Sequence, residues 1–158
     1  MNAALSIITQ QVECWEKLNH PALLERFIVR NGKPFAPVKR IGRKGKPNEC
    51  YSNAAQFVFR NGGTYVEGFA TSKALPFAFH HAWVSIGGLA MDPTLDAESY
   101  VYFGVEFGAE TLRAEMLRNG VYGILDPGFG LNVDLMFRLD PELEAICDAM
   151  MANKRRSA

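Results

Sequence analysis

Two strand-like segments joined by a pair of glycines constrain this fold most strongly. Residues 81–86 and 89–92 are rich in apolar side chains, and Gly87-Gly88 between them suits a two-residue hairpin turn. Such a turn fixes the pairing of the two strands and places Asp92 opposite Trp83. A three-residue turn would instead move Asp92 to the other face. We therefore expect an antiparallel hairpin with one defined register.

This register brings a histidine and a carboxylate together. Side chains two residues apart on a strand share a face, so His81, Trp83 and Asp92 are predicted on one side of the hairpin, with His81 diagonal to Asp92. His80 points to the other side and would replace His81 only if the register slipped. A carboxylate within reach of an imidazole fixes its tautomer and stabilises its cationic form.

The remaining pattern places helices first and a run of strands afterwards. Apolar periodicity and capping residues predict helices at about residues 3–18, 21–30, 50–61, 109–118 and 141–153. Further strands are predicted at residues 64–70 and 100–107, and a less regular strand pattern covers residues 121–125. This order favours the α+β class with an antiparallel sheet.

The composition fits one domain in a reducing compartment. The chain has 158 residues, of which 48% are apolar, enough for a sizeable core. Seventeen Lys and Arg balance seventeen Asp and Glu, so nucleic acid and anionic lipid are not expected partners. Three cysteines without a C-x-x-C pair argue against a disulfide framework and a zinc knuckle. With no signal-peptide pattern and no long apolar run, we expect a cytoplasmic protein without a membrane partner.

A basic segment precedes the strands. Residues 32–48 contain six cations, no acidic residue, and several glycines and prolines, which favours a loop or a long arm. Such an arm could contact phosphates without specificity, but a solvated loop is the more typical outcome of this composition. The arm runs directly into Cys50, so in an enzyme it would line the substrate cleft and favour acidic substrates.

Cys50 is the candidate nucleophile. Cys50, Ala54, Phe57 and Val58 form the apolar stripe of a helix for which Asn48 is a plausible N-cap, so the cysteine lies in the first helical turn. The partial positive charge of a helix N-terminus favours the thiolate. Most free cysteines are simply small buried apolar residues. The predicted base and its carboxylate partner, provided by the hairpin, shift the balance toward a catalytic interpretation.

Four short segments resemble the transglutaminase-like branch of the papain-like cysteine enzymes. They are Cys50-Tyr51-Ser52-Asn53-Ala54, Tyr65-Val66-Glu67-Gly68, His81-Ala82-Trp83-Val84 and Met91-Asp92-Pro93-Thr94. In that family a Cys at a helix N-terminus, a His in a His-Ala-Trp strand and an Asp in an Asp-Pro-Thr strand follow in this order. The resemblance covers about residues 48–95. It implies acyl transfer in which Cys50 attacks a carbonyl, His81 moves the proton and Asp92 holds His81.

The resemblance also implies an architecture and a substrate class. It implies a papain-like core, with the Cys-bearing helix packed on an antiparallel β-sheet and extra N- and C-terminal helices. Residues 1–158 are then one transglutaminase-like domain, with N-terminal helices in 1–31, a basic loop in 32–48, the catalytic core in 49–125 and a C-terminal helix in 138–154. The substrate is expected to be a protein or peptide-like amide, with peptidase, amidase or deamidase action favoured over crosslinking.

The family pattern is not matched ahead of the cysteine. Where such enzymes often carry an aromatic or amide residue for the oxyanion hole, this chain is basic, so Asn48 is the nearest amide and the Cys50 N–H the second donor. Trp83 is expected as an apolar wall beside the site. No cluster of acidic residues suits calcium, and neither a metal nor a cofactor is expected.

Two other interpretations use the same residues. Cys50, one of the adjacent histidines and Asp92 are permitted zinc ligands, but the usual closely spaced ligand pairs are missing and a fourth ligand cannot be named. Alternatively, the chain is a catalytically inactive binding module of the same fold. Its basic arm, residues 33–46, would then hold an acidic partner or nucleic acid.

Overall fold

Five strands close into a barrel that helices cover on its outer side. The computed structural model describes residues 2–18, 20–72, 74, 77–128 and 130–157. Within these residues the strands are β1 (Lys33–Val38), β2 (Thr64–Ser72), β3 (Ala78–Ile86), β4 (Leu89–Met91) and β5 (Tyr100–Phe107). The helices are α1 (Ala3–Lys17), α2 (Leu23–Asn31), α3 (Cys50–Asn61), the short 3-10 helix η1 (Ala97–Ser99), α4 (Ala109–Asn119), α5 (Val133–Leu139) and α6 (Pro141–Ser157). The chain is therefore α+β.

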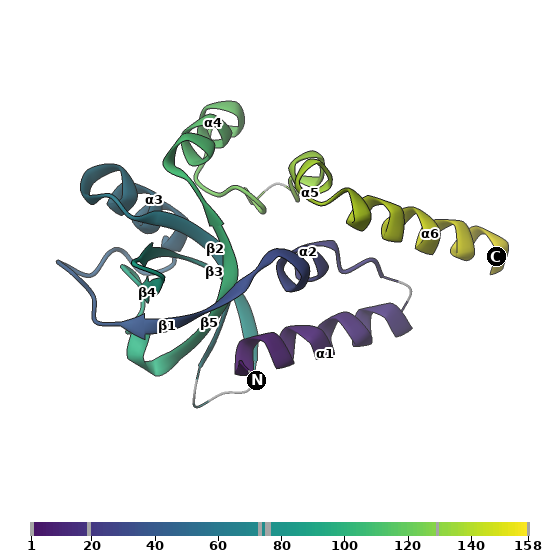
Figure 1. The fold of residues 1–158 in the computed structure, drawn as a ribbon, viewed down its shortest axis with the longest axis horizontal. Coiled ribbons are helices and arrows are strands. Elements are labelled where there is room, and N and C mark those ends of the chain that lie inside the picture. Colours follow the sequence, from purple (N-terminus) through teal and green to yellow (C-terminus); the bar gives the residue numbers. More distant parts are fainter. Residues whose placement is uncertain (1, 19, 73, 75–76, 129, 158) are drawn as a thin grey trace.

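The barrel order is β1-β4-β3-β2-β5 (Figure 1). Neighbouring strands are antiparallel except β1 and β4, which pair in parallel. The prediction of a sheet that is antiparallel throughout is thus wrong at this one pair. The prediction of a basic loop over residues 32–48 is also wrong for its first part. Residues 33–38 form β1, which pairs with β5 on one side and with β4 on the other. This strand closes the barrel and leaves residues 39–49 as the actual arm.

The glycine hairpin has the predicted register. Gly87 and Gly88 have φ angles of 59° and 82°, values that favour glycine, and Ile86 pairs with Leu89 across the turn. Strand β4 ends at Met91, so Asp92 lies immediately after the strand instead of on it. The two-residue turn therefore places Asp92 on the side of the hairpin that the sequence predicted.

One large side chain dominates the barrel interior. Trp83 is fully buried and packs with Phe35 and Tyr102. Its ring fits because two neighbouring strand positions are glycines: a Cβ atom at Gly68 or Gly104 would lie 2.9 or 2.6 Å from Trp83 Cη2. The sequence thus makes room for the indole at two glycines that pair with each other across β2 and β5.

Helices pack on the outer face of the barrel. In Figure 1, α1 and α2 lie beside each other next to the barrel, α3 lies near β2 and β3, and α6 extends away from the strands. Helix α3 contacts β3 and β2, while α6 contacts α5 and α2. The outer core includes Ala4, Ile8, Phe27, Ile28, Ala54, Val58 and Leu112. None of the helices in the described residues is long and apolar enough to span a membrane.

The strand predicted at residues 121–125 is wrong. The segment is irregular, although Ile124 and Leu125 are buried. Their N–H groups donate to the side chain of Glu67 instead of to a neighbouring strand. A carboxylate on β2 therefore satisfies the backbone that a strand partner would otherwise satisfy.

Candidate active site

Cys50 is the first residue of α3. The residue at the cap position is Glu49, whose side chain makes no capping hydrogen bond. The prediction of Asn48 as N-cap is wrong, since its backbone is left-handed with φ of 62° and it lies one residue too early. No side-chain cap therefore competes for the N–H groups at the start of this helix. These groups, and the positive end of the helix dipole, lie beside the cysteine.

Asp92 holds His81 through a short hydrogen bond. His81 Nε2 lies 2.7 Å from Asp92 Oδ2, and both side chains are buried. The carboxylate also accepts from the N–H groups of Thr94 at 2.7 Å and Leu95 at 2.9 Å, and from the Tyr102 hydroxyl at 2.8 Å. With four donors around it, the carboxylate has a fixed orientation, and so has the imidazole that it binds.

The Cys50 side chain lies close enough to His81 to interact with it and to raise the pKa of the imidazole. Since Asp92 occupies Nε2, Nδ1 is the ring nitrogen left for the sulfur. Cys50 is half-buried, whereas Cys14 is exposed and Cys147 buried, and all three are free thiols. The structure thus brings together the three residues that the sequence analysis singled out, from α3, β3 and the segment after β4.

Electrostatics favour a charged imidazole in this site. Burial, the largest influence, lowers the pKa of His81, but the hydrogen bonds to Asp92 and Cys50 and their charges outweigh it and raise this pKa to about 9. Burial likewise raises the pKa of Asp92. The hydrogen bond and the charge of His81, together with the N–H donors of Leu95 and Thr94, more than offset burial, so the pKa of Asp92 lies below its ordinary value. At neutral pH the pair is an imidazolium and a carboxylate. An imidazolium beside a thiol stabilises the thiolate.

Trp83 lies next to the imidazole. The two rings are nearly parallel, with an interplanar angle of 17° and centroids 6.4 Å apart. Trp83 has no exposed surface, so it excludes water from the His81–Asp92 pair and offers no surface to a substrate. The structure places Trp83 as an apolar wall beside His81, as expected. A direct contact between Trp83 and a substrate does not fit, because the side chain has no exposed surface. Asn48 is exposed and makes no hydrogen bond within the described residues.

A second polar cluster lies on the opposite face of β3 and was not predicted. His80 Nδ1 is 2.7 Å from the Tyr51 hydroxyl, and His80 Nε2 is 3.9 Å from Glu67. Glu67 in turn accepts from the Tyr65 hydroxyl at 2.8 Å. The only sequence signal was a charged residue in the middle of an apolar strand, inside a segment quoted for the family resemblance without a role.

Burial dominates the titration of this cluster. It raises the pKa of Glu67 to about 7, although the N–H groups of Leu125 and Ile124 and the Tyr65 hydroxyl act in the opposite direction. It also lowers the pKa of His80 to about 4, with Asp126 opposing and His81 reinforcing the effect. His80 is therefore neutral at pH 7, and His81 on the other face is the cationic histidine. The neutral state makes His80 a poor alternative to His81 for stabilising a thiolate.

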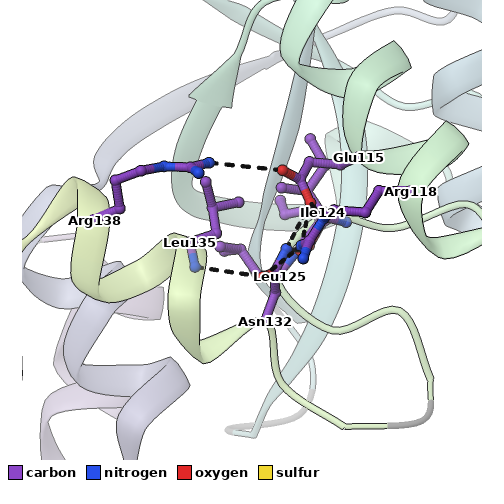
Figure 2. Close-up of polar contacts among 8 residues, drawn as sticks. Glu115, Arg118, Ile124, Leu125, Asn132, Leu135 and Arg138 are labelled. Carbon is purple, nitrogen blue, oxygen red and sulfur yellow. Dashed lines mark hydrogen bonds and ion pairs between the residues drawn. The ribbon is translucent and has the colours of Figure 1, made fainter.

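A third network fixes the irregular segment from its other side (Figure 2). Asn132 Nδ2 donates to Ile124 O and to Glu115 Oε2, both at 2.9 Å, and Arg118 donates to Asn132 Oδ1 at 2.8 Å. Arg138 approaches Glu115 at 3.8 Å. Residues 124–125 are thus held between Glu67 on β2 and Asn132 before α5.

Among the described residues, no group of three or more His, Cys, Asp or Glu side chains is arranged to hold a metal ion. The zinc interpretation of Cys50 and its neighbours accordingly has no ligand geometry to support it.

Comparisons of the chain with protein-family models, curated proteins and solved structures found no match. Function has to be argued from the geometry of the site.

Proposed function

We propose that this chain is a thiol-dependent acyl-transfer enzyme that acts on amide bonds, with Cys50 as nucleophile, His81 as acid and base, and Asp92 as the group that orients His81. One observation carries the proposal. A buried imidazole is bound at Nε2 by a carboxylate 2.7 Å away and interacts with a thiol at a helix N-terminus. Cysteine-dependent acyl transfer uses this arrangement, in which the base lies between the nucleophile and the group that orients the base.

The reaction follows from the charges of the three groups. In the reactive ion pair the proton of the Cys50 thiol resides on His81, and the thiolate forms a bond to the carbonyl carbon of the amide. As the carbon–nitrogen bond breaks, His81 returns the proton to the leaving nitrogen and Cys50 carries the acyl group as a thioester. Water, deprotonated by His81, then attacks the thioester, releasing the carboxylic acid and restoring the thiol.

The oxyanion of the intermediate needs hydrogen-bond donors. The Cys50 N–H and the other free N–H groups of the first turn of α3 are the donors that this chain offers, since Asn48 lies outside the cap. The closed apolar wall of Trp83 on the far side of His81 strengthens these electrostatic interactions by excluding water.

We also propose that the central part of the chain is a transglutaminase-like, papain-like core. Support comes from the packing of the Cys-bearing helix α3 against β3 and β2, which are antiparallel to each other, and from the chain order of nucleophile, histidine and aspartate. Helices α1, α2, α5 and α6 would then be additions to this core. Peptidase, amidase and deamidase activities fit the mechanism, because water is the default acceptor of the acyl group.

A small activated acyl donor tests the proposal without knowledge of the natural substrate. With p-nitrophenyl acetate, the wild-type chain should release p-nitrophenolate in a burst and carry one acetyl group on Cys50, located by peptide mass spectrometry. Cys50→Ser and His81→Gln should lose the burst, whereas Cys14→Ser is the matched control and should keep it. A His81→Gln variant with an undiminished burst would overturn the proposed roles.

The binding-module interpretation makes the opposite prediction. An inactive module would show no thioester on Cys50 under these conditions, and Cys50→Ser would retain its full biological effect.

A further inference from the structure

A groove lies between the basic arm and the exposed side of α3. It has a volume of about 480 Å³. One wall is the arm, residues 41–46, and the other is α3 with the residue before it. The side chains that line the helical wall are Glu49, Asn53, Gln56, Phe57, Arg60 and Asn61.

The arm is held against the helix by specific hydrogen bonds. The Gly45 N–H donates to Pro93 O at 2.7 Å. Asn53 Nδ2 donates to Lys46 O at 2.8 Å and to Thr94 Oγ1 at 3.0 Å, and Asn53 Oδ1 accepts from the Lys46 N–H at 3.3 Å. A Cβ atom at position 45 would lie 2.4 Å from the Asn53 side chain, so this close approach requires glycine. The groove is therefore a built feature of the fold.

Both walls of the groove are positively charged. Arg43, Lys44 and Lys46 extend from the arm and Arg60 from the helix, while Glu49 is the single acidic residue of the lining. Glu49 lies 3.6 Å from Lys46 and offsets one of these charges. In the part of the chain that the structure describes, no carboxylate lies within ion-pair distance of Arg43, Lys44 or Arg60. The groove thus carries three uncompensated cations, although the whole chain has no net charge.

Two residues that line the groove are neighbours in sequence of proposed catalytic residues. Glu49 directly precedes Cys50, and Pro93 directly follows Asp92. From Glu49 to Arg60 the helix rises about 16 Å, a length that about five residues of an extended peptide would cover. A chain lying in the groove would leave its far end beside Arg60 and its near end beside Glu49, the residue before Cys50.

We propose that this groove binds an acidic segment of a protein or peptide substrate and holds it next to the amide to be attacked, an inference that rests on the proposed function. Carboxylates of the segment would pair with the free cations of both walls. A nucleic acid fits less well, because Phe57 is the only aromatic side chain in the lining and successive bases need several stacking surfaces.

Binding of short labelled peptides tests the groove separately from the chemistry. The probe is a fluorescein-labelled peptide of alternating Glu and Gly, with a Ser-Gly peptide of equal length as the uncharged control. Fluorescence anisotropy is measured with the full-length Cys50→Ser chain, which cannot acylate. We expect binding of the Glu-Gly peptide that weakens as salt is added, and none of the Ser-Gly peptide.

Charge reversal locates the binding site. R43E/K44E should weaken binding of the Glu-Gly peptide at least about fivefold, because two attractive contacts become repulsive. K17E/R113E changes the net charge equally at exposed positions outside both the arm and the groove lining, and it should leave the dissociation constant unchanged. Far-ultraviolet circular dichroism of both double variants checks that the fold is retained.

Three results would overturn the inference. They are no binding of the Glu-Gly peptide, equal weakening by both double variants, and tighter binding of single-stranded DNA than of the acidic peptide under the same conditions. These results concern the groove alone, since the measurement uses a chain without the thiol. Failure of the acetyl-transfer test would instead count against the proposed catalytic residues, so the two failures are distinguishable.

Discussion

Replacing Asp92 by asparagine tests the central ion pair most sharply. Asp92→Asn keeps the shape of the side chain, and its remaining oxygen can still accept from the Thr94 and Leu95 N–H groups. The new amide nitrogen faces His81 Nε2 and the Tyr102 hydroxyl, where the wild-type carboxylate oxygen accepts hydrogen bonds. Two hydrogen bonds are thereby lost, and the buried imidazolium loses its counter-charge.

The expected loss of stability at pH 7 is about 3 kcal/mol. A hydrogen bond between charged groups contributes about 1.5–3 kcal/mol and a neutral one about 1 kcal/mol, and a buried charge without its partner is costly. His81 Nε2 can escape part of this cost by becoming neutral and accepting from the amide. That neutral tautomer would place an uncharged Nδ1–H beside Cys50 and remove the positive charge that stabilises the thiolate. Acylation of Cys50 should therefore slow by more than the fall in the folded fraction of the chain would cause.

The effect has a defined pH dependence. The pKa of His81 is raised from its ordinary 6.5 to about 9 in the folded chain, so its stabilising contribution is complete below pH 6.5 and is lost as the pH rises through 9. The difference in unfolding free energy between wild type and Asp92→Asn should be largest near pH 6 and shrink as the pH rises from 6.5 to 9.

Urea unfolding at several pH values measures this difference. Asp96→Asn is the matched control, since Asp96 is exposed and its change of charge is the same; it should cost less than about 0.5 kcal/mol. A difference between wild type and Asp92→Asn that is near zero, or that does not change between pH 6 and pH 10, would refute the ion-pair reasoning.

Two further predictions concern the side chains that support the site. Because burial raises the pKa of Glu67 from 4.5 to about 7, the folded chain favours protonated Glu67, and this residue's contribution to stability falls by about 3 kcal/mol as the pH rises from 4.5 to 7. The unfolding free energy of wild type minus that of Glu67→Gln should therefore decrease over this interval, and a constant difference in urea unfolding would contradict the assignment. Gly104→Ala should destabilise the fold by about 1–3 kcal/mol and slow acylation of Cys50, because the new Cβ would lie 2.6 Å from the ring that stacks on His81. Gly108→Ala, with open space around the new atom, is the control, and equal costs for both variants by thermal unfolding would argue against this packing.

The hairpin and the helix start could be predicted because local chemistry determines them. A two-residue glycine turn leaves one register for the strands on either side, and this register gave the pairing of His81 with Asp92. The apolar stripe from Cys50 to Val58 likewise determined the face of α3 that meets the barrel.

Closure of the barrel could not be predicted, because it depends on distant pairings. Strand β1 contains two prolines and lies in a stretch of cations, so its composition resembles a loop, and only its pairing with β5 and β4 makes it a strand. The role of Glu67 in holding residues 124 and 125 could not be predicted for a similar reason. Its partners are backbone N–H groups of residues 124 and 125, which carry no signal in the sequence.

Alkylation of the native chain by iodoacetamide at pH 6, followed for each cysteine by mass spectrometry, tests the convergence of thiol, imidazole and carboxylate most directly. Accessibility alone would make Cys14 react first, since it is exposed and Cys50 is half-buried. We predict that Cys50 reacts well ahead of Cys14, and that His81→Gln abolishes this advantage. Faster labelling of Cys14 in the wild type, or an unchanged Cys50 rate in His81→Gln, would contradict the account.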